Sequence, residues 1–74
     1  MKWDAHAMSR EDKKHMAKMI KELRVALGLT QEQFAAKVGV TFSTVNRWES
    51  GKSKPSPLAR RRIEELQEET RDRA

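Results

Sequence analysis

Apolar residues recur along the chain with helical spacing, in runs separated by glycine, threonine and proline. The first run has intervals of four, three and four residues: Met16, Ile20, Leu23 and Leu27. This spacing places the four side chains on one face of a helix. Ser9 and Asp12 can form a capping box ahead of the run, and Gly28 is suited to end it. The pattern predicts an amphipathic helix over residues 10–27.

The middle of the chain carries two helix starts only eleven residues apart. Thr30 can form a capping box with Gln33, and Thr41 can cap a second helix. Gly39 lies between them, where a left-handed residue ends the first of the two helices. The sequence predicts short helices near residues 31–38 and 42–50, joined by a tight turn. The side chains expected to face inward from them are Phe34, Ala35, Val38, Val45 and Trp48.

A fourth helix is predicted to begin at Pro57, because proline at the first helical position loses no hydrogen bond. Leu58, Ile63 and Leu66 are expected to dock on the core. The helix is basic at its start, over residues 60–62, and acidic further on, which allows Arg and Glu to pair within it and keeps its end away from a polyanion. The prediction is an all-α fold with a flexible arm at residues 1–8 and one domain at residues 9–74.

Length and composition fit this fold. The chain has 74 residues, of which 36% are hydrophobic and 36% charged, so we expect a single domain with a small core. The absence of tyrosine and the scarcity of β-branched residues argue against strands. The chain has no cysteine, no signal peptide is evident, and no apolar run approaches the length needed to span a membrane. These features favour a cytoplasmic protein.

The positive charge of the chain is concentrated on the two short helices and the residues that follow them. The net charge is +5 overall, and it divides into +3 for residues 1–29, +5 for residues 30–62 and −3 for residues 63–74. A polyanion is the natural partner for such a segment, since neutralising phosphates releases counterions from nucleic acid. A basic surface that serves only solubility is the alternative on charge alone.

The sequence contains no pattern of residues that is typical of an enzyme active site. His6 and His15 lie outside any apolar pocket pattern and are interpreted as solvated side chains. There is no glycine-rich phosphate loop and no HExxH stretch, and adjacent Glu64 and Glu65 would point in different directions from a helix. We therefore expect no catalytic residue, no metal site and no cofactor.

One segment of the chain, LGLTQEQFAAKVGVTFSTVNRWESGKSKPS, resembles the Cro and phage-repressor helix-turn-helix family. Most members of this family are bacterial or phage transcription regulators. The resemblance spans about residues 23–56, and it includes the family's small residue, turn glycine and two core contacts at Ala35, Gly39, Val45 and Trp48. It implies a small four-helix, lambda-repressor-like DNA-binding domain with a central helix-turn-helix and a recognition helix at about residues 42–50.

The resemblance implies that base edges are read by Phe42, Ser43, Asn46 and Arg47. Arg47 can donate two hydrogen bonds to guanine, although a phosphate contact is the alternative. Phe42 departs from the family, which usually has a polar residue there; its ring would rest on thymine methyl groups, or pack against Gln31 or a partner subunit. Ser43 can bond to a base or to a phosphate.

Further positions are expected to contact the DNA backbone or to hold the fold. Gln31 stands at a helix N-terminus, where N–H groups and the helix dipole favour a phosphate. The full set of expected phosphate contacts is Thr30, Gln31, Thr41, Thr44, Lys52, Ser53 and Lys54. Arg24 and Glu49 match positions where relatives often have a structural ion pair, so neither is expected to read bases.

Two functions follow as hypotheses. The first is a sequence-specific regulator, a repressor that binds double-stranded DNA as a homodimer on a palindromic operator. The second is an antitoxin-like subunit that binds a protein partner through its fourth helix or its N-terminal arm and regulates its own operon. The sequence does not indicate a small-molecule ligand.

Overall fold

The computed structural model describes the backbone of residues 10–73 and the side chains of residues 12–71. Within this range the chain forms four helices and no strand: α1 (Arg10–Ala26), α2 (Gln31–Val38), α3 (Phe42–Glu49) and α4 (Pro57–Arg73). The all-α prediction is confirmed, and the first three predicted helices end within one residue of their observed ends. The arm expected at residues 1–8 and the cap expected at Ser9 lie outside the described residues.

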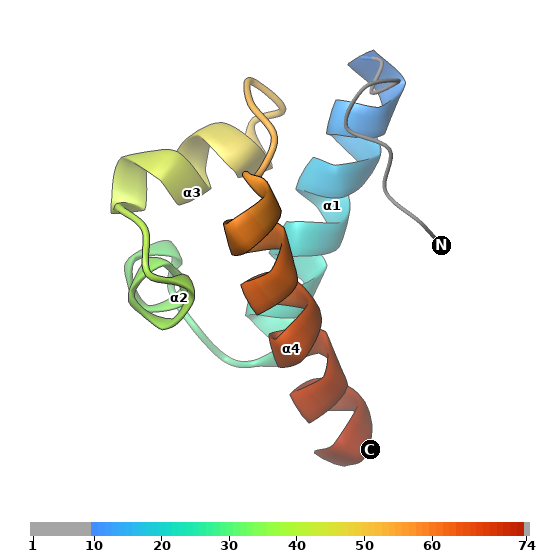
Figure 1. Cartoon of the computed structure of the whole chain (residues 1–74), viewed down its shortest axis with the longest axis vertical. Helices are drawn as coiled ribbons and strands as arrows, with labels where there is room; N and C mark the ends of the chain where they lie inside the picture. The colour runs from blue at the N-terminus through green and yellow to red at the C-terminus, as the bar shows by residue number, and fades with distance from the viewer. Residues whose placement is uncertain (1–9, 74) are drawn as a thin grey trace.

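The two long helices form a crossed pair, and the two short helices pack against this pair. In Figure 1, α4 crosses in front of α1, and α2 and α3 lie together on one side of this pair. Helix α3 contacts both α1 and α2, while α4 contacts α1 and α2. The short helices are therefore held against the long ones as a unit, and α3 stands at the outside of the molecule.

Every helix contributes to the core a side chain with no exposed surface. These four residues are Ile20, Phe34, Val45 and Ile63, and each is 0% exposed. Around them lie the other buried members of the cluster, which are Met16, Leu23, Ala35, Trp48, Ala59 and Leu66. The small Ala35, only 2% exposed, lets α2 approach its neighbours closely. Because every helix contributes to this one cluster, its packing fixes the orientation of the short helices.

The predicted inward face of α4 was wrong at its first apolar residue. Leu58 is 79% exposed, and Ala59 is buried in its place beside Ile63 and Leu66. The spacing explains this outcome, because residues 59, 63 and 66 follow one another at four and three residues, while Leu58 is turned by about 100° from Ala59. Pro55, just before α4, is also buried. Leu58 therefore contributes an apolar side chain to the surface.

Both ends of α2 have the predicted capping interactions. Thr30 Oγ1 accepts from the Gln33 N–H at 3.1 Å, and Gln33 Oε1 accepts from the Thr30 N–H at 2.9 Å, which completes a capping box. At the other end of α2, Gly39 has φ 90°, in the left-handed region. The N–H groups of Gly39 and Val40 both donate to the carbonyl oxygen of Ala35, at 2.8 and 2.9 Å. These bonds end α2 and turn the chain directly into α3.

A contact between α4 and α2 was not predicted from the sequence. Arg62 Nε donates to the main-chain oxygen of Lys37, in the last turn of α2, at 3.0 Å. Arg62 Nη1 also donates to Glu65 Oε1 at 2.9 Å, which is an arginine–glutamate pair of the kind expected within α4. A positive charge at the carboxyl end of a helix is favourable, since the carbonyl groups there lack partners within the helix. Arg62 thus helps to anchor the helix-turn-helix on α4.

Candidate nucleic-acid interface

Helix α3 presents a polar and aromatic face to the outside. Phe42 is 50% exposed, and Ser43, Asn46 and Arg47 are exposed as well. The opposite side of the helix is buried through Val45 and Trp48, which are 0% and 3% exposed. The structure therefore brings the four residues expected to read bases onto one accessible surface, which we call the α3 outer face.

The N-terminal end of α3 is held by two threonines. Thr41 Oγ1 accepts from the Thr44 N–H at 3.2 Å, and the two hydroxyl groups lie 2.8 Å apart within hydrogen-bonding distance. Thr41 is exposed and Thr44 is half-buried. Their hydroxyl groups are thus already engaged in capping α3, so a phosphate contact here would share a group that also serves the cap.

The C-terminal end of α3 leads into the basic loop. Gly51 has φ 76°, and the N–H groups of Gly51 and Lys52 donate back to the oxygens of Trp48 and Arg47 at 3.1 and 3.0 Å. This arrangement ends the helix and reverses the chain. Lys52 and Lys54 follow as exposed residues, and Ser53 is half-buried. The loop therefore places two cations near the end of the α3 outer face.

An ion pair joins α1 to α3. Arg24 Nε donates to Glu49 Oε2 at 2.7 Å and Arg24 Nη2 donates to Glu49 Oε1 at 3.1 Å, while Nη1 donates to the main-chain oxygen of Leu29 at 2.9 Å. The side chains of Arg24 and Glu49 are only 15% and 7% exposed. The hydrogen bond to Glu49 raises the pKa of the Arg24 guanidinium, although desolvation opposes this shift. Neither charged group is available to DNA, in keeping with the structural role expected for the two residues.

The same carboxylate is connected to the α3 outer face through two amide side chains. Gln31 Nε2 donates to Glu49 Oε1 at 3.1 Å, and Asn46 Nδ2 donates to Gln31 Oε1 at 3.3 Å. The sequence did not predict these contacts, because each residue looks like an ordinary polar surface position when taken alone. These contacts could be anticipated only after Glu49 had been placed by its ion pair with Arg24, because Gln31 at the start of α2 donates to the same carboxylate. We call Arg24, Glu49, Gln31 and Asn46 the α3 relay.

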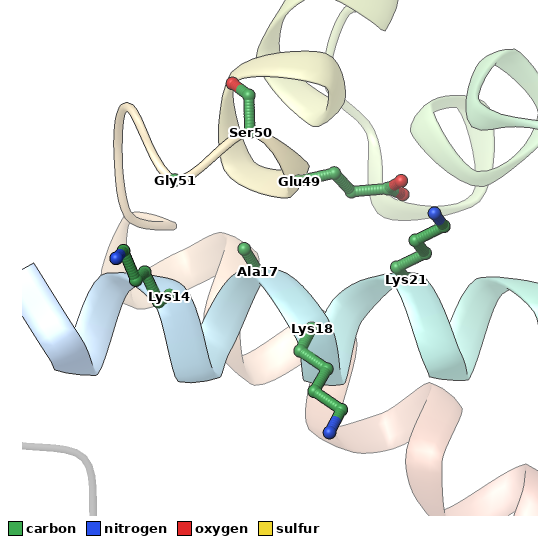
Figure 2. Close-up of a pocket in the computed structure, with 7 residues that line it drawn as sticks. All are labelled: Lys14, Ala17, Lys18, Lys21, Glu49, Ser50 and Gly51. Carbon is green, nitrogen blue, oxygen red and sulfur yellow. The ribbon is translucent and has the colours of Figure 1, made fainter.

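A shallow groove lies between α1 and the C-terminal end of α3. Its volume is about 300 Å³, and Figure 2 shows Lys21 directed toward Glu49 of α3 and Lys14 on the side of the loop at Gly51, while Lys18 points away. Glu49 and Gly51 line it from α3 and the loop. Lys14, Lys18 and Lys21 are all exposed, and Glu49 is already paired with Arg24. Within residues 12–71, no group of three histidine, aspartate or glutamate side chains is placed to hold a metal ion.

Hydropathy adds one further finding. Among the residues that the structure describes, no helix is both long enough and apolar enough to cross a membrane.

The fold and the α3 outer face define a small helical domain with a helix-turn-helix motif. A sequence model of the helix-turn-helix family matches residues 20–68, which covers all of α2 and α3, most of α4 and the C-terminal part of α1. The chain belongs to the Cro/C1-type helix-turn-helix family, a class of DNA-binding regulators whose members are typically not enzymes. The resemblance inferred from the sequence is thereby confirmed.

The chain is also similar to a curated protein from Methanothermobacter thermautotrophicus. That protein is named as an uncharacterized HTH-type transcriptional regulator, and it is 46% identical to this chain over 48 residues. The aligned region covers 65% of this chain and 70% of that protein. No solved structure gives a significant match to the chain.

Proposed function

We propose that the protein is a sequence-specific regulator that binds double-stranded DNA by inserting α3 into the major groove. The observation that carries this proposal is the division of α3 into two sides, with Val45 and Trp48 buried and Phe42, Asn46 and Arg47 exposed. The major groove of B-DNA is wide enough to admit a helix, and each base pair presents a distinct pattern of donors and acceptors there. Membership of a DNA-binding family supports the same conclusion.

The proposed base contacts follow from the chemistry of each side chain. Arg47 donates to O6 and N7 of guanine, and Asn46 contacts an adjacent base edge. The ring of Phe42 rests on thymine methyl groups, which its 50% exposure allows. Ser43 contributes a hydroxyl contact with little selectivity. Arg47 is the residue that we expect to carry the most discrimination.

The proposed phosphate contacts flank the α3 outer face. The main-chain N–H groups at the start of α2, at Gln31, lie outside the helical hydrogen-bond ladder and favour an anion. Thr30, Thr41 and Thr44 would add hydroxyl contacts, and the loop would add Lys52, Ser53 and Lys54. These contacts fix the position of the protein on the duplex but carry no sequence information directly.

We further propose that the protein is a repressor acting as a homodimer on a palindromic operator. A single half-site gives limited specificity, because each correct base pair contributes only about 1–3 kcal/mol. Two copies would read half-sites about 34–36 Å apart, one helical turn of DNA. The contact between copies is proposed at α4 and the basic loop, and the exposure of Leu58, at 79%, supports α4 as part of it.

Selection of binding sites from random duplex DNA tests the proposal. The expected result is an enriched sequence with two-fold symmetry, followed by tighter binding to that sequence than to a scrambled duplex in an anisotropy titration at physiological salt. Equal affinity for all duplexes would remove the claim of sequence specificity. A specific but asymmetric site, bound by a single copy of the chain, would leave DNA recognition standing and overturn the homodimer.

A further inference from the structure

We propose that Gln31 is a positioning residue for base selection: the Glu49 carboxylate, acting through Gln31, orients the Asn46 amide so that its carbonyl oxygen faces the DNA. This inference rests on the proposed function, since it concerns which base Asn46 selects. It goes further because it assigns a role in sequence reading to a side chain that does not itself read a base.

Glu49 sets which group of each amide in the α3 relay donates and which accepts. Its carboxylate is 7% exposed and receives two hydrogen bonds from Arg24, at 2.7 and 3.1 Å. An ionised carboxylate has only acceptors to offer. Any amide that contacts Glu49 must therefore turn its NH2 group toward it. Gln31 does so, with Nε2 donating to Glu49 Oε1 at 3.1 Å.

This first contact decides the orientation of the next one. Because the NH2 group of Gln31 faces Glu49, its carbonyl oxygen must point to the other side. There Gln31 Oε1 accepts from Asn46 Nδ2 at 3.3 Å. One N–H of Asn46 is thus used in a bond to the protein, and the acceptor character of the Glu49 carboxylate sets the orientation of both amides. The direction of both amides follows from one buried charge.

Asn46 is left with a defined set of groups for a ligand. Its side chain is exposed on α3, with Oδ1 and the second N–H of Nδ2 remaining after the bond to Gln31. An acceptor beside a donor matches the N6 amino group and N7 of adenine in the major groove. An asparagine without the Gln31 contact can rotate and turn either group toward the DNA. The relay therefore favours adenine at the pair that Asn46 faces and disfavours a base that presents only acceptors.

The first experiment needs no DNA. Gln31→Met keeps the length of the side chain and removes both hydrogen-bonding groups. We expect the side-chain amide resonances of Asn46 to shift in the 1H–15N spectrum of this variant, while the backbone resonances of the core residues Val45 and Ile63 stay in place. Unchanged Asn46 resonances would show that Gln31 does not hold the amide, and would overturn the inference whatever the protein binds.

The second experiment compares base preference at the selected site. Duplexes carrying each of the four base pairs at the position read by Asn46 are titrated with the unaltered protein, Gln31→Met, Asn46→Ala and the double variant. Asn46→Ala is expected to lose the preference for adenine, a discrimination of about 5- to 150-fold for one bidentate contact. Gln31→Met is expected to lower the preference for adenine by at least about fivefold, and to do so at this position only. In the double variant, Gln31→Met should cause no loss of the preference for adenine beyond the loss caused by Asn46→Ala.

Lys52→Met is the matched control, since it removes a proposed phosphate contact. It should weaken binding to all duplexes about equally and reduce the salt dependence. If Gln31→Met behaves in the same way, the Gln31 side chain is a phosphate contact and the positioning role is wrong. If the unaltered protein itself shows no sequence preference, it is the proposed function that fails, and the spectrum of Gln31→Met still decides whether the amide is held.

Discussion

Arg24 on α1 and Glu49 on α3 are separated by 25 residues in the chain, yet Arg24 Nε lies 2.7 Å from Glu49 Oε2. Both side chains are largely excluded from water, so each charge depends on the other. The pair connects a long helix to the helix that carries the proposed reading face. Its stability and the geometry of the proposed interface are therefore linked.

Loss of one partner of this ion pair should strongly destabilise the fold. Glu49→Ala would leave the Arg24 guanidinium without its carboxylate in a mostly buried position, and we expect the free energy of unfolding to fall by about 3–5 kcal/mol. Urea denaturation followed by circular dichroism measures the change. The double variant Arg24→Met with Glu49→Leu, which removes both charges, should be closer to the unaltered protein than Glu49→Ala is. A loss below about 1 kcal/mol for Glu49→Ala would mean that the pair behaves like an exposed one.

The ion pair should also be insensitive to alkaline pH. The hydrogen bond to Glu49 raises the pKa of Arg24 above its ordinary value. A group whose pKa is raised on folding contributes its full stabilisation below its pKa in the unfolded chain, and loses it only as the pH rises through the folded value. Between about pH 7 and 9, the difference in unfolding free energy between Arg24→Met and the unaltered protein should therefore stay constant. A difference that shrinks between about pH 7 and 9 would contradict the raised pKa of Arg24.

The turn at Gly39 should tolerate other residues only with strain. Its φ is 90°, and a Cβ atom added there would meet no atom within 4 Å, so the cost of a side chain comes from the backbone conformation alone. Gly39→Ala should lower the free energy of unfolding by about 1–2 kcal/mol. Gly39→Asn is the control, since asparagine enters the left-handed region more easily, and it should cost less than alanine. Equal losses in thermal denaturation would point to a steric cause instead.

The orientation of α4 can be tested with two apolar residues near its start. Ile63 is 0% exposed, and Ile63→Ala should cost about 2–5 kcal/mol because it leaves a cavity in the core. Leu58 is 79% exposed, and Leu58→Ala should change the free energy of unfolding of the monomer by less than about 0.5 kcal/mol. Denaturation at two protein concentrations separates this effect from any contribution to a dimer. A large loss for Leu58→Ala that does not depend on concentration would contradict the orientation of α4.

The short helices could be predicted well because their signals are local. Thr30, Gln33 and Gly39 specify the ends of α2 through contacts between residues a few positions apart. Leu58 was misplaced because the prediction favoured the larger apolar side chain over the helical spacing, which places Ala59 on one face with Ile63 and Leu66.

The contacts that cross between helices were harder to predict. The bond from Arg62 to the Lys37 carbonyl spans 25 residues, and one side of it is a backbone atom that any residue could supply. The relay from Glu49 to Asn46 has the same difficulty, since it depends on the angle between α2 and α3. The Arg24 and Glu49 pair was expected only because of the family resemblance, and the charges of the two residues gave no indication of their partner.

Arg47 and Lys52 lie five residues apart, and they should affect DNA binding in different ways. Arg47→Ala is expected to weaken the free energy of binding to the selected site by about 1–3 kcal/mol, because a bidentate base contact is lost. It should also relax the preference for guanine at one position. Lys52→Ala should weaken binding to selected and scrambled duplexes alike. If each copy of a dimer neutralises about four phosphates, a plot of log affinity against log salt should have a slope of about −7, and Lys52→Ala should lower its magnitude by about one unit per copy. Titrations at several salt concentrations separate the two residues. If Arg47→Ala instead lowers the slope and leaves base preference intact, Arg47 contacts a phosphate, and the reading of guanine must be reassigned to another residue of the α3 outer face.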